Sequence, residues 1–199
     1  MIALSKGEKD GSEISSAEQR SRDMTCIKGD IFGATIAATY YLLAIKVFPN
    51  YLPFLRFPEQ LPLESRLALG IKCLIPPAVM MLMGVHAVGV GRGGTVNDDP
   101  TSRAGSVPRS KRLAVNLRYL GNTHEQLLVH MITNMGMCVL LPGKFLHLVP
   151  LNALLFVLGR FMFWAGYHID PLYRNPGFAL TEFPTLAQLV YCAFRLIKG

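Results

Sequence analysis

The sequence has few cysteines, and they give no pattern of a disulfide-stabilised or zinc-binding protein. Only four occur among 199 residues, far apart and mostly inside apolar stretches: Cys26, Cys73, Cys138 and Cys192. A disulfide framework or a zinc site needs closely spaced pairs, so neither is expected. We expect small buried hydrophobic side chains instead. S-palmitoylation stays an open alternative for Cys26, which stands just outside an apolar stretch.

Acidic residues are also few, so the excess of basic residues needs an explanation. The chain has 13 acidic and 20 basic residues, with a net charge of +7. Much of the excess lies in short segments beside apolar blocks, where Lys and Arg set membrane topology, so we do not expect nucleic-acid binding. The glycine-rich residues 89–94 lack the Lys-Ser/Thr ending of a phosphate loop. His124 and His130 are six residues apart, which does not match a zinc helix, so no metal is expected.

Long apolar blocks dominate the sequence. Hydrophobic residues make up 51% of the chain, and the mean hydropathy is +0.32. The blocks are about as long as a membrane helix, roughly 20 residues, and charged residues separate them. We predict an all-α integral membrane helical bundle with five spans, at residues 31–48, 66–91, 113–141, 145–169 and 178–197.

The polar segments define the predicted domain organisation. Residues 1–30 have no apolar signal core and should form a flexible cytosolic tail. Residues 31–48 are an extra transmembrane helix, followed by a four-helix domain at 66–199 that contains a basic cytosolic loop at 92–112. Counting Lys and Arg on the two sides places the N-terminus in the cytosol.

A buried charge stands in the fourth block. Arg160 lies inside an apolar run, where a charge costs about 2.5–3.5 kcal/mol at the centre of a membrane helix. Arg160, Tyr167 and Arg174 are spaced i, i+7 and i+14, which is one face if the helix continues to Pro171. Such a stripe indicates a functional site. The alternative is that Arg160 pairs with a buried carboxylate for packing alone.

The third block carries polar residues on two adjoining faces: Arg118, Asn122, Glu125, Gln126, His130 and Asn134. The first three follow i, i+4, i+7 spacing, and steps of four from Asn122 lead to Asn134. A polar stripe of this kind cannot face lipid. For His130 and Asn134 we expect interhelical hydrogen bonds of about 0.6 kcal/mol each.

The predicted topology brings both stripes to the cytosolic end of the bundle. Arg118 opens a helix that enters the membrane there, and Arg174 follows one that returns. A cleft between them would hold several cations and one carboxylate. Its ligand should be anionic, with more than one carboxylate or phosphate and one ammonium opposite Glu125.

These motifs resemble a known family. Arg118-x3-Asn122-x2-Glu125 on one helix and Arg160-x6-Tyr167-x6-Arg174 on the next resemble the membrane-associated proteins in eicosanoid and glutathione metabolism (MAPEG). The resemblance covers about residues 66–198. It implies a homotrimer of four-helix protomers, with glutathione bound in a cytosol-facing cleft between neighbouring protomers.

The resemblance also implies roles for single residues. Glutathione would be held by Arg118, Asn122, Glu125, Arg160 and Tyr167, while Arg174 would stabilise its thiolate as the catalytic residue. This agrees with the chemistry of glutathione, which has two carboxylates, one ammonium and a thiol whose ionisation a guanidinium favours. Phe163 and Gln126 depart from the pattern, because leukotriene-forming members have tyrosines there.

The extra first helix, the proline-rich connection and the basic loop resemble the mattrin-like branch of this family. Two functions therefore stay open. One is a glutathione-dependent transferase or peroxidase. The other, implied by that branch, is a non-catalytic regulator of membrane-receptor abundance in Wnt/Frizzled signalling. The implied location is the endoplasmic reticulum, Golgi or lysosomal membrane, and the implied partners are the protein itself, membrane lipid and membrane receptors.

Overall fold

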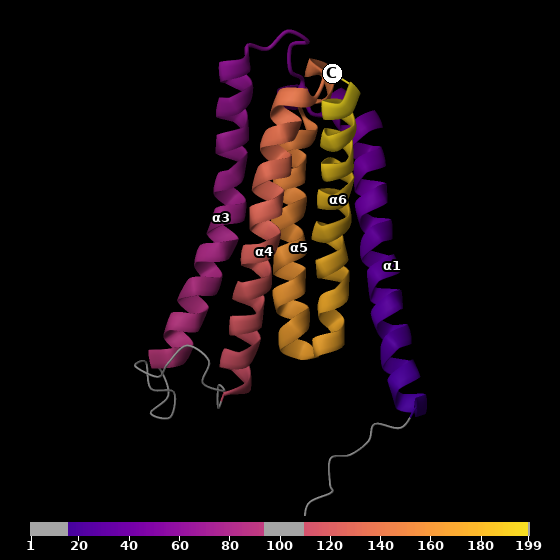
Figure 1. The fold of residues 1–199 in the computed structure, drawn as a ribbon, viewed down its shortest axis with the longest axis vertical. Helices are drawn as coiled ribbons and strands as arrows, with labels where there is room; N and C mark the ends of the chain where they lie inside the picture. Colours follow the sequence, from indigo (N-terminus) through magenta and orange to yellow (C-terminus); the bar gives the residue numbers. More distant parts are fainter. Residues whose placement is uncertain (1–15, 94–109, 199) are drawn as a thin grey trace, which may run out of the picture.

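A computed structural model describes residues 16–93 and 110–198, and this part of the chain is helical with no strand. Its long helices lie side by side (Figure 1): α1 (Ser16–Lys46), α3 (Leu63–Gly93), α4 (Lys111–Leu140), α5 (Leu148–Ile169) and α6 (Asn175–Lys198). Short elements connect them: α2 (Phe48–Tyr51), η1 (Pro53–Leu55), η2 (Gly143–Phe145) and η3 (Pro171–Arg174). The predicted all-α class is confirmed.

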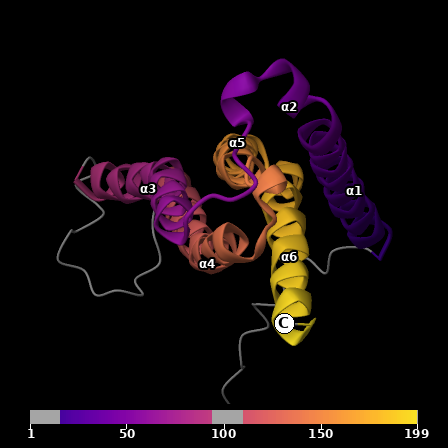
Figure 2. The ribbon, with the colours of Figure 1, turned by 90° about the horizontal axis from the view of Figure 1, so that it is seen from above.

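Helices α4, α5 and α6 form the centre of the bundle, with α3 and α1 on opposite sides (Figure 2). Helix α3 packs mainly on α4, and α1 mainly on α6. Helices α1 and α4 begin at the same end of the bundle at which α3 and α5 end (Figure 1). We call it the η3 end, because η3 connects α5 to α6 there.

Capping residues fix the helix boundaries near the η3 end. The Ser110 hydroxyl accepts a hydrogen bond from the Leu113 N–H at 3.4 Å, which caps the start of α4. Asp170 follows α5 in extended backbone geometry, and its carboxylate accepts a hydrogen bond from the Leu172 N–H at 2.8 Å. Pro171 then opens η3, because its fixed φ suits a first helical turn.

Two helices of the described residues are long and apolar enough to cross a membrane. These segments are Leu63–Arg92 and Gly143–Ile169, which contain 18-residue stretches with mean hydropathies of 1.9 and 1.7. The outer surface of α3 exposes large apolar side chains, including Ile71 at 60% and Val90 at 74%. Such a surface suits lipid or another membrane protein. The arrangement with five spans stays a prediction.

The predicted flexible tail is too long, because α1 begins at Ser16 and residues 16–30 are helical. An ion pair between Glu18 and Arg22 at 2.9 Å supports this first part of the helix at i, i+4 spacing. Packing supports it further on, where the Asn175 side-chain amide donates to the Cys26 carbonyl at 3.4 Å. The contact with α6 is tertiary, which is why composition alone did not reveal it.

Two other predicted features can be located. Of the predicted basic loop 92–112, residues 94–109 lie outside the described part, and the flanking residues belong to α3 and α4. All four cysteines are free; Cys73, Cys138 and Cys192 are buried, as predicted. Cys26 is half-buried beside α6.

Candidate functional site

A cavity of about 270 Å³ lies near the η3 end. Its lining comes from α1, α4, α5, η3 and α6: Asp30, Arg118, Asn122, Phe163, Arg174, Asn175 and Phe178. The structure thus brings Arg118, Asn122 and Arg174 together around one space, as expected for residues of a shared site. We call this space the η3 cavity.

Tyr167 connects the two arginines of the η3 cavity. The Arg118 guanidinium donates a hydrogen bond from Nη1 to the Tyr167 hydroxyl at 2.9 Å. The Arg174 guanidinium lies over the Tyr167 ring, 5.0 Å from its centroid. The ring is only 2% exposed, so its position is fixed by the bundle. One buried phenol therefore orients two cations, through its hydroxyl and through its π-face.

Arg174 reaches this position by a route that the sequence did not predict. Helix α5 ends at Ile169, before Pro171, and η3 carries Arg174. The turn folds back on α5 at Gly166, where an added Cβ would lie 3.3 Å from the Arg174 nitrogen and would clash with the Tyr173 carbonyl. A side chain at position 166 would thus displace η3. The glycine before Tyr167 has a direct structural role.

Arg160 lies behind the η3 cavity and does not line it. Its side chain is fully buried, at 0% exposure. Nη1 donates to the Asn122 side-chain oxygen at 2.7 Å, and Nη2 donates to the Thr181 hydroxyl. The guanidinium also lies 4.8 Å from the centroid of the Phe163 ring. No ion pair of Arg160 occurs among the described residues, so the alternative of a paired buried carboxylate is not found.

The close crossing of α5 and α6 brings Thr181 to Arg160. An added Cβ on Gly159 would lie 3.1 Å from the Gly177 carbonyl and would clash with the Thr181 methyl group. Small residues of this kind allow two helix backbones to approach closely. The sequence interpretation missed Thr181. Its available signal was the i, i+4, i+7 spacing of Thr181, Thr185 and Gln188 on one face of α6.

Glu125 was also predicted to be a site residue, but the structure does not place it in the cavity lining. It is exposed on the outer surface of α4 and does not line the η3 cavity. A half-buried acidic residue on the neighbouring helix is Glu182 of α6, to which the Gln126 side-chain amide donates a hydrogen bond. Glu182 was not singled out from the sequence, because its partner lies 56 residues away.

The prediction of interhelical hydrogen bonds for His130 and Asn134 is wrong for the described residues. Neither side-chain atom of Asn134 has a hydrogen-bond partner, and Nε2 of His130 has none. Both residues are buried, at 1% and 0% exposure. The His130 ring faces Phe156 with 4.6 Å between centroids, and a phenyl ring offers no conventional acceptor.

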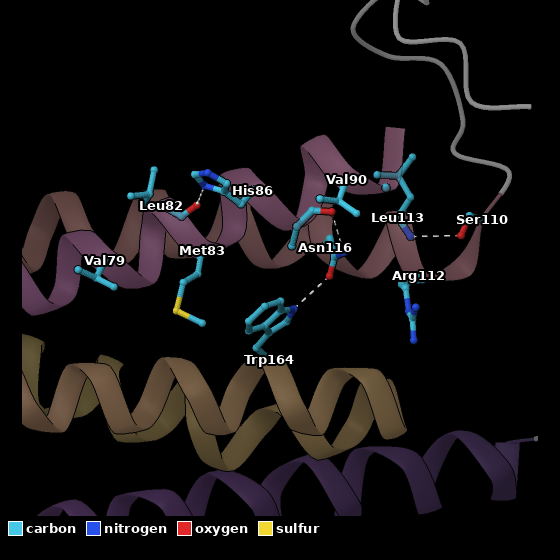
Figure 3. A pocket seen from close by; sticks show the side chains of 12 residues that line it. Val79, Leu82, Met83, His86, Val90, Ser110, Arg112, Leu113, Asn116 and Trp164 are labelled. Atoms are coloured by element: carbon cyan, nitrogen blue, oxygen red, sulfur yellow. Dashed lines mark hydrogen bonds between the residues drawn. The ribbon is translucent and has the colours of Figure 1, made fainter. Parts of the chain in front are cut away.

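A larger groove of about 860 Å³ runs along α3 and α4 (Figure 3). Its apolar lining includes Val79, Leu82 and Met83 of α3, and it lies beside Trp164 of α5. The Trp164 indole N–H donates to the Asn116 side-chain oxygen at 3.1 Å. We call it the α3 groove; among its described lining residues, Arg112 supplies the one arginine or lysine side chain.

Comparison with known proteins identifies the family of this chain. The model of the MAPEG family matches residues 69–194, from the first turns of α3 to near the end of α6. The searches of curated proteins and of solved structures give no significant match. The matched region contains Arg118, Asn122, Tyr167 and Arg174 and excludes α1. Since it covers more than half of the 199 residues, the chain belongs to the MAPEG family.

Proposed function

We propose that this protein binds glutathione in the η3 cavity, on the cytosolic side of a membrane. The main support is the pair of guanidinium groups of Arg118 and Arg174, held on the two sides of buried Tyr167. Guanidinium groups suit carboxylates, and a guanidinium beside a thiol favours the thiolate. Glutathione presents both kinds of group in one small molecule. Family membership agrees with this ligand.

Each residue around the cavity has a distinct part in the proposed complex. Arg118 binds a carboxylate, and Asn122 binds the peptide through its side-chain amide. Arg160 positions Asn122, since its guanidinium is fully buried and occupied by Asn122 and Thr181. Tyr167 orients Arg118, and Arg174 stabilises the thiolate.

The outer face of α4 supports the proposed homotrimer. Glu125 is exposed on this face, together with Leu128 at 55% and Ile132 at 66%. The three residues follow i, i+3, i+7 spacing and therefore lie on one side of the helix. A carboxylate in the middle of a membrane helix is costly against lipid. We place this face against a neighbouring protomer, where Glu125 can contact the glutathione that the neighbour holds.

Two observations bear on whether the bound glutathione reacts. The α3 groove offers an apolar site for a second substrate, which a transferase or peroxidase needs. Helix α1 lies outside the matched residues and packs on α6, an addition that favours the mattrin-like branch. The second candidate function is therefore the non-catalytic regulator of membrane-receptor abundance, using the same fold and ligand.

Titration calorimetry of glutathione with the full chain in lipid nanodiscs tests the proposal. Arg118→Ala should weaken binding about tenfold, because a charge-assisted contact with a ligand carboxylate is lost. Arg195→Ala, an exposed arginine in the last turn of α6, is the matched control and should bind as the parent does. The same samples are then assayed for conjugation of an aryl halide.

The results separate the functions. Binding with conjugation identifies a transferase. Binding without conjugation, and without reduction of an organic hydroperoxide, supports the regulator. A parent protein that shows no heat of binding at millimolar glutathione refutes the proposed ligand. An Arg195→Ala variant as weak as Arg118→Ala would show that overall charge, and not the η3 cavity, determines binding.

A further inference from the structure

Asp30 brings a carboxylate to the η3 cavity from outside the four-helix region of the family match. It belongs to α1, and it lines the cavity together with Arg118 and Arg174. Its side chain is half-buried. Among the described residues it makes no hydrogen bond and no ion pair, although two guanidinium groups border the same space. A space therefore separates this carboxylate from the two cations.

Packing on both sides of Asp30 fixes its position. Cys26, Asp30 and Gly33 follow i, i+4, i+7 spacing and share one face of α1. The Cys26 carbonyl accepts a hydrogen bond from the Asn175 amide at 3.4 Å. Gly33 lies against α6, where an added Cβ would be 2.8 Å from the Ala179 Cβ. Asp30 is thus attached to the site by contacts one turn before and one turn after it.

The electrostatics of this arrangement favour a ligand with charges of both signs. Partial burial raises the pKa of Asp30, because the ionised carboxylate loses hydration without gaining a partner. A ligand ammonium would supply that partner. A ligand carboxylate would meanwhile meet Arg118 or Arg174 across the cavity.

The size of the cavity indicates which part of the ligand it holds. Its volume of about 270 Å³ is close to the lower limit for small-molecule sites, roughly 300 Å³. It suits an amino-acid head with adjacent ammonium and carboxylate groups. The γ-glutamyl end of glutathione is such a head.

We infer that Asp30 binds the ammonium of the ligand, so that α1 completes the site and selects zwitterionic heads over purely anionic ones. This inference rests on the proposed binding of glutathione. It assigns the ammonium to Asp30 in place of Glu125, which is exposed and does not line the cavity, although it follows Asn122 by three residues on α4. It also gives α1 a function in ligand selection.

The test compares glutathione with its deaminated analogue, glutaryl-cysteinyl-glycine, which lacks only the ammonium. Both are titrated into the full chain in nanodiscs. The parent should prefer glutathione about tenfold, the effect of one ion pair of roughly 1.4 kcal/mol. Asp30→Asn should reduce the preference to less than about twofold. It should leave affinity for the analogue unchanged or improved, because a repelling carboxylate is removed.

Asp30→Glu and Glu125→Gln are the matched variants. Asp30→Glu keeps a carboxylate on α1 and should retain most of the preference, which separates charge from folding defects. Glu125→Gln should retain the parent preference in full.

Several results would overturn the inference. If the parent binds both compounds equally, no carboxylate of the protein recognises the ammonium, and the inference is refuted. The proposed binding of glutathione is then unaffected. A preference lost in Glu125→Gln but kept in Asp30→Asn assigns the ammonium to Glu125. A parent that binds neither compound refutes the proposed ligand, and the inference with it.

Discussion

The docking of α1 on α6 can be tested at Gly33. In Gly33→Ala, the new Cβ would lie 2.8 Å from the Ala179 Cβ and would clash with the Pro176 carbonyl. The Pro176 carbonyl is backbone and cannot rotate away. Overpacking of this kind costs about 1–3 kcal/mol. Replacing glycine by alanine in a helix contributes about 1 kcal/mol in the opposite direction. We therefore expect a net loss of up to about 2 kcal/mol of unfolding free energy.

Gly89→Ala is the matched control, because nothing lies within 4 Å of a Cβ added at Gly89 of α3. It carries the helix-propensity gain without the clash, so the two variants should differ by about 1–3 kcal/mol. Reversible unfolding in mixed micelles measures this difference. Maleimide labelling of half-buried Cys26 reports the local effect and should be faster in Gly33→Ala. Equal stability and equal labelling in both variants would show that α1 does not pack on α6 as described.

Three further predictions follow from the site and its surroundings. Detergent-corrected mass measurement should find three protomers per particle, and a strict monomer in both mild detergent and nanodiscs would contradict the trimer. Arg174→Ala should leave glutathione binding largely intact but abolish the ultraviolet thiolate absorbance at neutral pH, and Arg174→Lys should restore it in part; a parent without thiolate absorbance would contradict the catalytic role. Thr181→Val should cost about 1–2 kcal/mol of stability, because a buried Arg160 N–H loses its acceptor. Its control is Thr35→Val at an exposed position of α1, which removes only a hydroxyl bonded to its own helix; a similar loss there would contradict the explanation.

Regular spacing made part of the site predictable. Steps of three, four and seven residues place side chains on one face whatever the tertiary packing, so Arg118 and Asn122 could be placed together from the sequence. The approach of Arg174 to Tyr167 was also anticipated. The reason for this approach was not anticipated. Helix α5 ends at Ile169, and η3, which packs on Gly166, brings Arg174 back.

Contacts between elements far apart in the sequence could not be predicted in this way. Asp30 enters the cavity because α1 packs on α6, and Thr181 meets Arg160 because two glycines allow α5 and α6 to cross closely. Thr181 shares a polar face of α6 with Thr185 and Gln188, but that spacing does not show which residue it meets. His130 and Asn134 also belong to a polar stripe, yet their predicted partners are absent among the described residues. Periodicity specifies a face, whereas the opposing helix decides what that face meets.

The distribution of charge around Arg160 connects the fold to the ligand. Neutral groups contact this buried cation, namely the Asn122 amide oxygen, the Thr181 hydroxyl and the Phe163 ring, while its Nε has no hydrogen-bond partner among the described residues. Around the η3 cavity, two guanidinium groups and the single carboxylate of Asp30 leave one net positive charge among the described lining residues. Glutathione with its thiol protonated carries two carboxylates and one ammonium, hence one net negative charge. The net charge of the lining is thus opposite in sign to that of the ligand. Because Arg174 is assigned to the thiolate, only Arg118 is left in this cavity for a ligand carboxylate, which agrees with a cavity that holds the γ-glutamyl head alone.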